Sequence, residues 1–184
     1  MAELSGKKIL VLVTNQGVEQ DELKVPLEKL RADGAEVTVA APETGEVKSL
    51  VGDWDRGETF PVDQTISSVN ESEYDLLLLP GGTLNADALR LNEDAQEIAK
   101  SFASSGRPVA ALCHGPWLLV ETGVVDGKTL TSYASLKTDI TNAGGNWVDQ
   151  EVKVCPANEW TLITSRDPGD LEAFVGAIKE QLSI

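Results

Sequence analysis

Cys113 and His114 are the residues of this 184-residue chain whose types and spacing best fit a chemical reaction. His114 is the only histidine, and it directly follows one of the two cysteines. A cysteine reacts as its thiolate, and a helix N-terminus or a neighbouring imidazole can lower a thiol pKa from about 8.5 to between roughly 3.5 and 7.5. The pair therefore predicts a nucleophilic thiolate with a histidine beside it to move protons.

The sequence on either side of Cys113 decides between this interpretation and a plainer one, in which Cys113 is a small buried residue at a strand end and His114 lies on the surface. Residues 109–112 are small and apolar, as in a strand buried on both faces. A helical pattern begins at Pro116 and stops at Gly123. Cys113 would then lie on a sharp strand-to-helix turn, a nucleophile elbow, which lifts its side chain above the strand ends.

Apolar runs and helical patterns predict the elements that must position this turn. Strands are expected at residues 7–14, 36–41, 74–79, 129–132, 148–155 and 160–164, and helices at 19–33, 86–104 with a break near Asn92, 134–143 and 168–182. A strand, a helix and a second strand in succession imply a parallel pair with a right-handed crossover. The sequence thus predicts an α/β domain with a mostly parallel sheet and helices on both faces.

Two stretches between these elements could contribute to a site. Residues 43–70 form short β-prone pieces separated by glycines, which we interpret as a β-excursion from the sheet. Trp54 and its neighbours Asp53, Asp55 and Arg56 could line a site, but a turn that packs the tryptophan over the core is the favoured interpretation. Pro80-Gly81-Gly82 follows a buried strand, so its N–H groups could bind a developing oxyanion, or the glycines could form a plain tight turn.

Composition limits the classes of partner. The chain has 30 acidic and 15 basic residues, a net charge of −15, so its surface should repel nucleic acid and anionic membranes. No leader-like or membrane-spanning stretch is visible, which makes the cytoplasm the expected location and free thiols the expected state of both cysteines. One histidine and two cysteines argue against a metal site, no phosphate-binding loop motif is present, and we expect no cofactor. The length fits one domain, residues 1–184.

Several separated motifs in order resemble those of the PfpI-like family of intracellular cysteine hydrolases and stress proteins, within the class I glutamine amidotransferase-like superfamily. They are Leu79-Pro80-Gly81-Gly82, Ala111-Leu112-Cys113-His114-Gly115-Pro116, Thr131-Ser132-Tyr133, Asn142-Ala143-Gly144 followed by Trp147-Val148-Asp149, and Thr164-Ser165-Arg166. The resemblance extends from Lys7 to the last helix. It implies a flavodoxin-like three-layer sandwich.

The resemblance also implies a role for each site residue. Cys113 matches the family nucleophile, and His114 matches the catalytic histidine. Glu19 matches the acid beside the sulfur, where a protonated carboxyl can stabilise a thiolate or an oxidised sulfur. Gly82 and His114 match the positions whose backbone N–H groups form the oxyanion site. The third triad member in the family is a glutamate from a neighbouring subunit; its nearest match is Asp87, one methylene shorter and in a loop one residue longer, which implies a homodimer or a higher homo-oligomer.

Three functions stay open. The first is a cysteine-dependent hydrolase whose substrate is a peptide or a small aldehyde-derived adduct, that is, a peptidase or a glyoxal-adduct deglycase or glyoxalase. The second is a redox sensor or chaperone-like stress protein with an oxidisable Cys113 and no turnover. The third is a binding or scaffold protein. Cys155 lies among strand residues and is expected to be an inert packing thiol.

Overall fold

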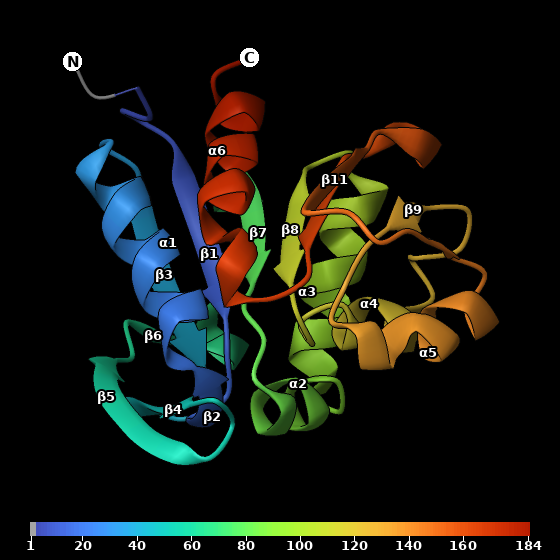
Figure 1. Ribbon diagram of the computed structural model, residues 1–184. Helices are drawn as coiled ribbons and strands as arrows, with labels where there is room; N and C mark the ends of the chain where they lie inside the picture. Colours follow the sequence, from blue (N-terminus) through green and yellow to red (C-terminus); the bar gives the residue numbers. More distant parts are fainter. Residues whose placement is uncertain (1–2) are drawn as a thin grey trace.

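A seven-stranded sheet forms the centre of the computed structural model, which describes residues 3–184 (Figure 1). Its order is β11-β12-β8-β7-β1-β3-β6, and every neighbouring pair is parallel except β11 with β12. The strands are β1 (Lys8–Leu12), β3 (Glu36–Ala41), β6 (Gln64–Thr65), β7 (Leu76–Leu79), β8 (Val109–Leu112), β11 (Val152–Cys155) and β12 (Leu162–Ser165). The predicted mostly parallel sheet is confirmed.

Helices cover both faces of this sheet. They are α1 (Gln20–Ala32), α2 (Thr83–Leu89), α3 (Glu93–Ser104), α4 (Trp117–Thr122), α5 (Lys137–Asn142) and α6 (Leu171–Leu182). Helices α1 and α6 pack on one face, and α3, α4 and α5 contribute to the core on the other (Figure 1). Short 3-10 turns lie at Ile66–Ser68, Glu71–Glu73, Ala134–Leu136, Ala157–Glu159 and Pro168–Asp170. The result is the flavodoxin-like three-layer sandwich.

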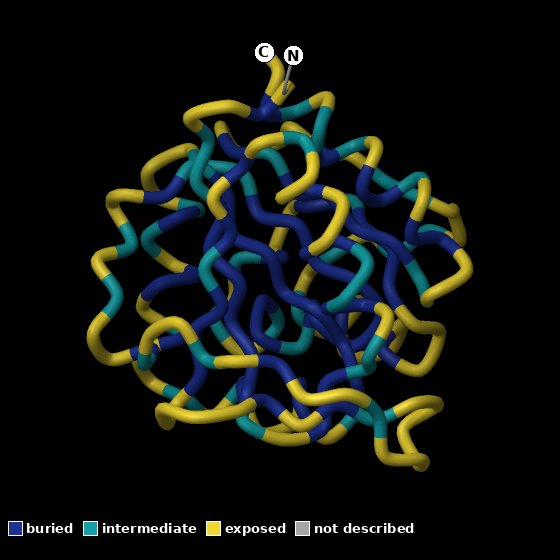
Figure 2. The backbone as a smooth tube through the Cα atoms, turned by 90° about the vertical axis from the view of Figure 1, so that its left-hand side faces the viewer, coloured by how far each residue is buried: buried dark blue, intermediate teal, exposed yellow. Residues whose placement is uncertain are grey.

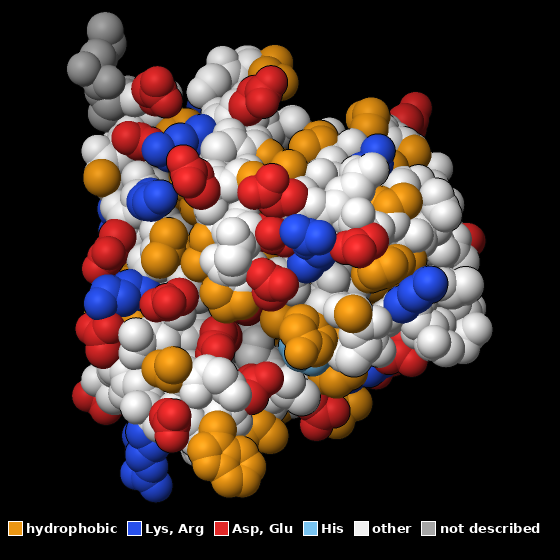
Figure 3. All heavy atoms as spheres, viewed as in Figure 1, with side chains coloured by type: hydrophobic (Ala, Val, Ile, Leu, Met, Phe, Trp, Pro, Cys, Tyr) orange, Lys and Arg blue, Asp and Glu red, His pale blue; other side chains and the backbone are white. Residues whose placement is uncertain are grey.

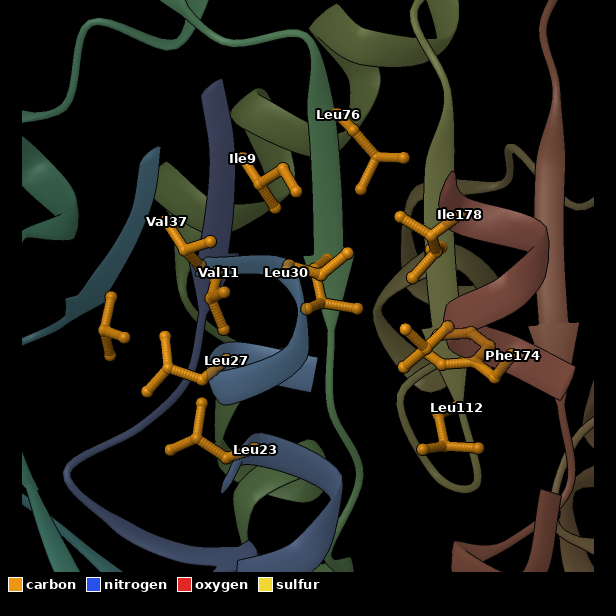
Figure 4. Packing of buried hydrophobic residues seen from close by; sticks show 14 of the residues in the cluster. Ile9, Val11, Leu23, Leu27, Leu30, Val37, Leu76, Leu112, Phe174 and Ile178 are labelled. Carbon is orange, nitrogen blue, oxygen red and sulfur yellow. The ribbon is translucent and has the colours of Figure 1, made fainter. Parts of the chain in front are cut away.

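Alternating side chains on each strand explain why the strands are apolar throughout. On β1, Ile9 and Val11 point into the core beneath α1 and α6, while Leu10 and Leu12 point into the core beneath α3 and α4, and all four are fully buried. Figure 4 shows the first core, where Leu23, Leu27 and Leu30 of α1 and Phe174 and Ile178 of α6 lie over the strands. Figure 2 shows buried stretches of backbone running through the interior, with exposed stretches around them.

The predicted β-excursion is a hairpin that forms a second, smaller sheet. Strands β4 (Glu46–Val51) and β5 (Asp55–Pro61) pair antiparallel, and β2 (Gln16–Glu19) pairs with β4. At the tip, Gly52 and Asp53 have φ angles of 66° and 62°, and the Trp54 N–H donates to the Val51 carbonyl at 3.3 Å, as in a type I′ turn. Trp54 is 87% exposed, so the expectation that it packs over the core is wrong. The turn instead holds its side chain out at the hairpin tip.

The C-terminal third differs in detail from the prediction. Strands β9 (Thr129–Leu130) and β10 (Asn146–Trp147) pair with each other in a separate two-stranded sheet. Residues 148–151 were expected to open strand β11 but lie before it. Both cysteines are buried free thiols, and Cys155 accepts a bond from the Thr129 N–H at 3.3 Å. Within residues 3–184, no helix has the length and hydrophobicity that crossing a membrane requires.

Candidate active site

Cys113 lies on the sharp turn between β8 and α4. Its φ angle is 61°, in the left-handed region that residues other than glycine seldom adopt. The turn is held on both sides, because the Cys113 N–H donates to the Ser165 carbonyl at 3.1 Å and the Cys113 carbonyl accepts from the Tyr133 N–H at 2.9 Å. The parallel strand β12 therefore fixes the position of the sulfur-bearing residue.

Two glycines allow the backbone to approach this turn. A Cβ atom on Gly115 would lie 2.3 Å from the Leu79 carbonyl oxygen, and one on Gly81 would lie 2.4 Å from Glu22 Oε1 and 2.9 Å from Cys113 Cβ. Real Cβ atoms essentially never lie this close to a neighbouring atom, so both positions favour glycine. The turn after β7 and the turn after β8 thus meet directly at Cys113.

Glu22 of α1 supplies the carboxyl beside the sulfur. Its side chain is fully buried, Oε1 accepts from the Gly81 N–H at 2.8 Å, and Oε2 has no hydrogen-bond partner among residues 3–184. Burial raises the pKa of Glu22 from 4.5 to about 8, and the carboxyl faces the Cys113 thiol. Glu22 therefore keeps its proton at neutral pH.

This finding corrects the sequence assignment of Glu19. Glu19 lies at the rim, where its two carboxylate oxygens accept from the Gly52 N–H at 2.6 and 3.0 Å, and it precedes the first turn of α1. Glu22 lies one turn further on, in line with Pro26 and Leu30 at intervals of four residues on the buried face. A carboxylate within that apolar stripe was the signal that could have identified Glu22.

The pKa of the Cys113 thiol is raised, although the sequence led us to expect a lowered one. Burial raises the pKa of Cys113, an ionised Glu22 would raise it further, and the His114 N–H acts in the opposite direction. The expected helix N-terminus belongs to a short helix that begins four residues later, at Trp117. Cys113 Sγ lies 3.2 Å from His114 Nδ1, so the sulfur can pass its proton to a group that it contacts rather than to solvent.

His114 is enclosed by aromatic rings and hydroxyls. Its ring stacks on Tyr133 with centroids 4.7 Å apart and meets the edge of Trp117 at 5.3 Å. Nε2 lies 3.4 Å from Thr83 Oγ1 and 3.5 Å from Ser135 Oγ. Burial lowers the pKa of His114, which leaves the imidazole neutral at pH 7.

Asp53, at the tip of the β4–β5 hairpin, reaches this site through Thr83. Asp53 Oδ1 accepts from the Thr83 N–H at 2.9 Å, and Oδ2 accepts from the Thr83 hydroxyl at 2.7 Å. The sequence indicated Asp53 only as a possible lining residue and gave no signal for Thr83. Nothing local in the sequence indicates that the hairpin tip meets the start of α2.

These groups surround a cavity of about 160 Å³. Four carboxyl side chains line it and no Lys or Arg does; the lining residues are Glu19, Glu22, Gly52, Asp53, Gly82, Cys113, His114, Tyr133, Asp167 and Pro168. Acidic side chains also gather on this face around a hollow (Figure 3). Of the residues singled out from the sequence, Cys113, His114, Gly82 and Glu19 thus lie together.

Asp87 lies apart, on the exposed side of α2, without a bond to His114 inside the described chain. Its role across a subunit interface stays a prediction. Residues 3–184 contain no group of three or more His, Cys, Asp or Glu side chains that could hold a metal ion.

Comparison with known proteins places this architecture in a family. The model of the DJ-1/PfpI family matches residues 7–181. The chain is 41% identical to the deglycase PfpI of Pyrococcus furiosus, over 91% of this chain and 95% of that protein, and 41% identical to the putative cysteine protease YraA of Bacillus subtilis, over 91% and 94%.

A solved structure of a two-domain protein from Anabaena variabilis, with DJ-1/ThiJ/PfpI-like and ferritin-like domains, superimposes with a TM-score of 0.86 at 33% identity. The match covers 96% of this chain and 48% of that protein, so this chain spans about half the length of the two-domain protein. The family model and the curated relatives both extend over nearly the whole sequence. The chain belongs to the DJ-1/PfpI family.

Proposed function

We propose that this protein is a stress-related cysteine-dependent hydrolase that acts on small adducts formed between an amine and an aldehyde such as a glyoxal. The observation that carries the proposal is the placement of Cys113 Sγ, 3.2 Å from His114 Nδ1 and facing the protonated Glu22, in one small cavity. The volume of about 160 Å³ is well below the roughly 300–1,000 Å³ of pockets that enclose drug-sized ligands, which favours a small substrate. The name deglycase of the Pyrococcus relative supports this substrate class.

The proposed reaction is covalent. Cys113 on its nucleophile elbow gives its proton to His114 Nδ1, the sulfur forms a bond to the hydroxyl-bearing carbon of the adduct, and the electron pair of the carbon–nitrogen bond leaves with the amine, which takes its proton from His114. The N–H groups of Gly82, which lines the cavity, and of His114, which contacts the sulfur, bind the oxygen on that carbon. Water then adds to the same carbon as the carbon–sulfur bond breaks, which releases the aldehyde as its hydrate and returns a proton to the sulfur.

Glu22 has a defined part in this scheme. A carboxyl with a pKa of about 8 is a hydrogen-bond donor at neutral pH, and a thiolate is an acceptor. Loss of the Cys113 proton to His114 therefore leaves a thiolate that can accept a hydrogen bond from the Glu22 carboxyl. This compensates for the burial that raises the thiol pKa.

A redox sensor is the second candidate. Glu22 Oε2 is buried without a hydrogen-bond partner among the described residues, and an oxygen on an oxidised Cys113 would be a partner for its proton. In that case Cys113 reacts with peroxide instead of with a carbonyl carbon. A peptidase remains open as well, because YraA is named a putative cysteine protease.

The proposal takes residues 1–184 as one catalytic domain that works in the cytoplasm as a homodimer or higher homo-oligomer. The charge of −15 supports small or peptide substrates over nucleic acid. Asp87 on the exposed side of α2 is the residue that such an assembly could bring to a neighbouring site.

The decisive experiment compares Cys113→Ser with Cys155→Ser as a matched control. Methylglyoxal-treated N-acetylarginine and casein serve as substrates, and release of free amine and of peptides is measured. We expect wild type and Cys155→Ser to release amine and Cys113→Ser to release none. If wild type and Cys113→Ser release equal amounts from both substrates, the hydrolase proposal is wrong; Cys113-specific labelling after peroxide treatment would then identify the sensor.

A further inference from the structure

We propose that Asp53 and Thr83 fix the tautomer of His114 from within the same chain, so that His114 Nδ1 is the bare nitrogen that receives the Cys113 proton. This inference deepens the proposed function and rests on it. Asp53 and Thr83 are positioning residues here, because they act through His114 and do not touch the sulfur.

The first step is the direction of the Thr83 hydroxyl. Asp53 presents two oxygens to Thr83, and an ionised carboxylate only accepts hydrogen bonds. Oδ1 takes the backbone N–H at 2.9 Å, and Oδ2 takes the hydroxyl hydrogen at 2.7 Å. The single hydrogen of Thr83 Oγ1 is therefore already used on Asp53.

The second step follows at His114. Thr83 Oγ1 lies 3.4 Å from Nε2 and, with its hydrogen committed, can only accept from it. Nε2 must then carry the ring hydrogen. Because burial lowers the pKa of His114, the ring is neutral and holds one hydrogen, which leaves Nδ1 unprotonated 3.2 Å from Cys113 Sγ.

The other hydroxyl at Nε2 does not oppose this arrangement. Ser135 Oγ lies 3.5 Å from Nε2, and its hydrogen is not directed by a carboxylate. It can turn a lone pair toward an Nε2 that carries a hydrogen. Asp53 also favours the imidazolium that forms when the Cys113 proton moves to Nδ1, since its charge raises the pKa of His114 against the effect of burial.

The turn of the β4–β5 hairpin holds Asp53 beside Thr83. This turn needs positive φ at both central residues, and Asp53 adopts 62° although it is not glycine. Gly52 donates to Glu19 and Asp53 accepts from Thr83, so both turn residues are tied to the site while Trp54 points outward. The hairpin thereby supplies in cis the carboxylate that the family resemblance places on a neighbouring subunit.

Substitutions at Thr83 and Asp53 test the inference. Thr83→Val removes the hydroxyl but keeps the shape of the side chain and the backbone N–H that Asp53 accepts. Asp53→Asn leaves one acceptor for two donors; if its oxygen stays on the N–H, its amide nitrogen drives the Thr83 hydrogen toward Nε2 and selects the opposite tautomer. Thr83→Ser restores the hydroxyl. Thr141→Val, on the exposed side of α5, and Asp55→Asn, on the same hairpin, are the matched controls.

Two readouts separate this inference from the proposed function. One is kcat/KM for the methylglyoxal adduct; the other is the pH profile of Cys113 alkylation by iodoacetamide, which needs no substrate. We expect Thr83→Val and Asp53→Asn to lower both at neutral pH by at least about tenfold, since general-base catalysis contributes typically about 10²–10⁴-fold. Thr83→Ser should stay within about threefold of wild type, and the controls should match wild type.

Equal alkylation profiles for wild type and Thr83→Val would overturn the inference. So would a Thr83→Ser variant as slow as Thr83→Val, because packing alone would then explain the loss. A larger loss in Asp87→Asn than in Asp53→Asn would assign the orienting carboxylate to a neighbouring subunit instead. A wild type that alkylates through Cys113 with the expected Thr83 dependence but turns over no adduct would refute the proposed function and leave the inference standing.

Discussion

Replacing Glu22 by Gln should change how the stability of the protein depends on pH. In the folded protein the Glu22 pKa is raised from 4.5 to about 8 by burial, so the folded state holds this proton more tightly than the unfolded chain does. The contribution of the Glu22 proton to the free energy of unfolding is therefore fully present below pH 4.5 and is lost as the pH rises toward 8. At about 1.4 kcal/mol per unit of pKa, ionising Glu22 in place costs roughly 5 kcal/mol.

Gln keeps an oxygen for the Gly81 N–H and never ionises, so the variant avoids this cost. We expect the free energy of unfolding of Glu22→Gln, relative to that of wild type, to be roughly 3–5 kcal/mol more favourable to the folded state at pH 8 than at pH 5. The variant should therefore unfold at a higher urea concentration than wild type at pH 8. Urea titrations at pH 5, 6, 7 and 8 measure this, and Glu28→Gln, on the exposed side of α1, is the control. Parallel stability curves for wild type and Glu22→Gln over this range would show that Glu22 is already ionised at neutral pH and would refute the reasoning.

Two further substitutions test packing, one beside Cys113 and one at the buried Lys128. Gly81→Ala places a Cβ 2.4 Å from Glu22 Oε1 and 2.9 Å from Cys113 Cβ, so Cys113 must shift. Iodoacetamide should then label Cys113 more slowly, even in a variant that circular dichroism shows to be folded. An unchanged labelling rate would contradict the close approach. Lys128→Met removes a fully buried ammonium that donates to the carbonyls of Cys155, Ala157 and Trp160. Urea unfolding should show that the free energy of unfolding falls by about 2–4 kcal/mol. An unchanged free energy of unfolding would mean that those carbonyls find other donors.

The central sheet was predictable because its strands are buried on both faces. Residues 9–12 and 76–79 are apolar without a break, and a helix with this character would be longer. The start of β11 was not predictable in the same way. Residues 148–151 read as strand, but β12 offers partners only for residues 152–155, and the Val148 N–H donates to Leu130 instead. Which backbone groups pair depends on residues far away in the chain.

The geometry of the candidate site was predictable where residue chemistry and local turn geometry coincide. Cys113 follows a buried strand and precedes a helix, and that pattern alone identified the turn. The acid was assigned to Glu19 instead of Glu22 because both lie in one acidic run, and only the face of α1 separates them. Asp53 and Thr83 are 30 residues apart, and the contact between them depends on how the hairpin lies against α2, which no short-range pattern encodes.

The contacts around Cys113 form a series in which each hydrogen has a single acceptor. Glu22 keeps a proton because it is buried, the sulfur can release its own only to His114 Nδ1, and Nε2 faces a hydroxyl whose hydrogen is held by Asp53. Reversing any one hydrogen leaves two donors or two acceptors facing each other in a buried site, which costs about 1–3 kcal/mol for each unsatisfied group. In the proposed mechanism, a buried thiol with a raised pKa reacts near neutral pH because its proton moves along contacts that are already oriented and not into water.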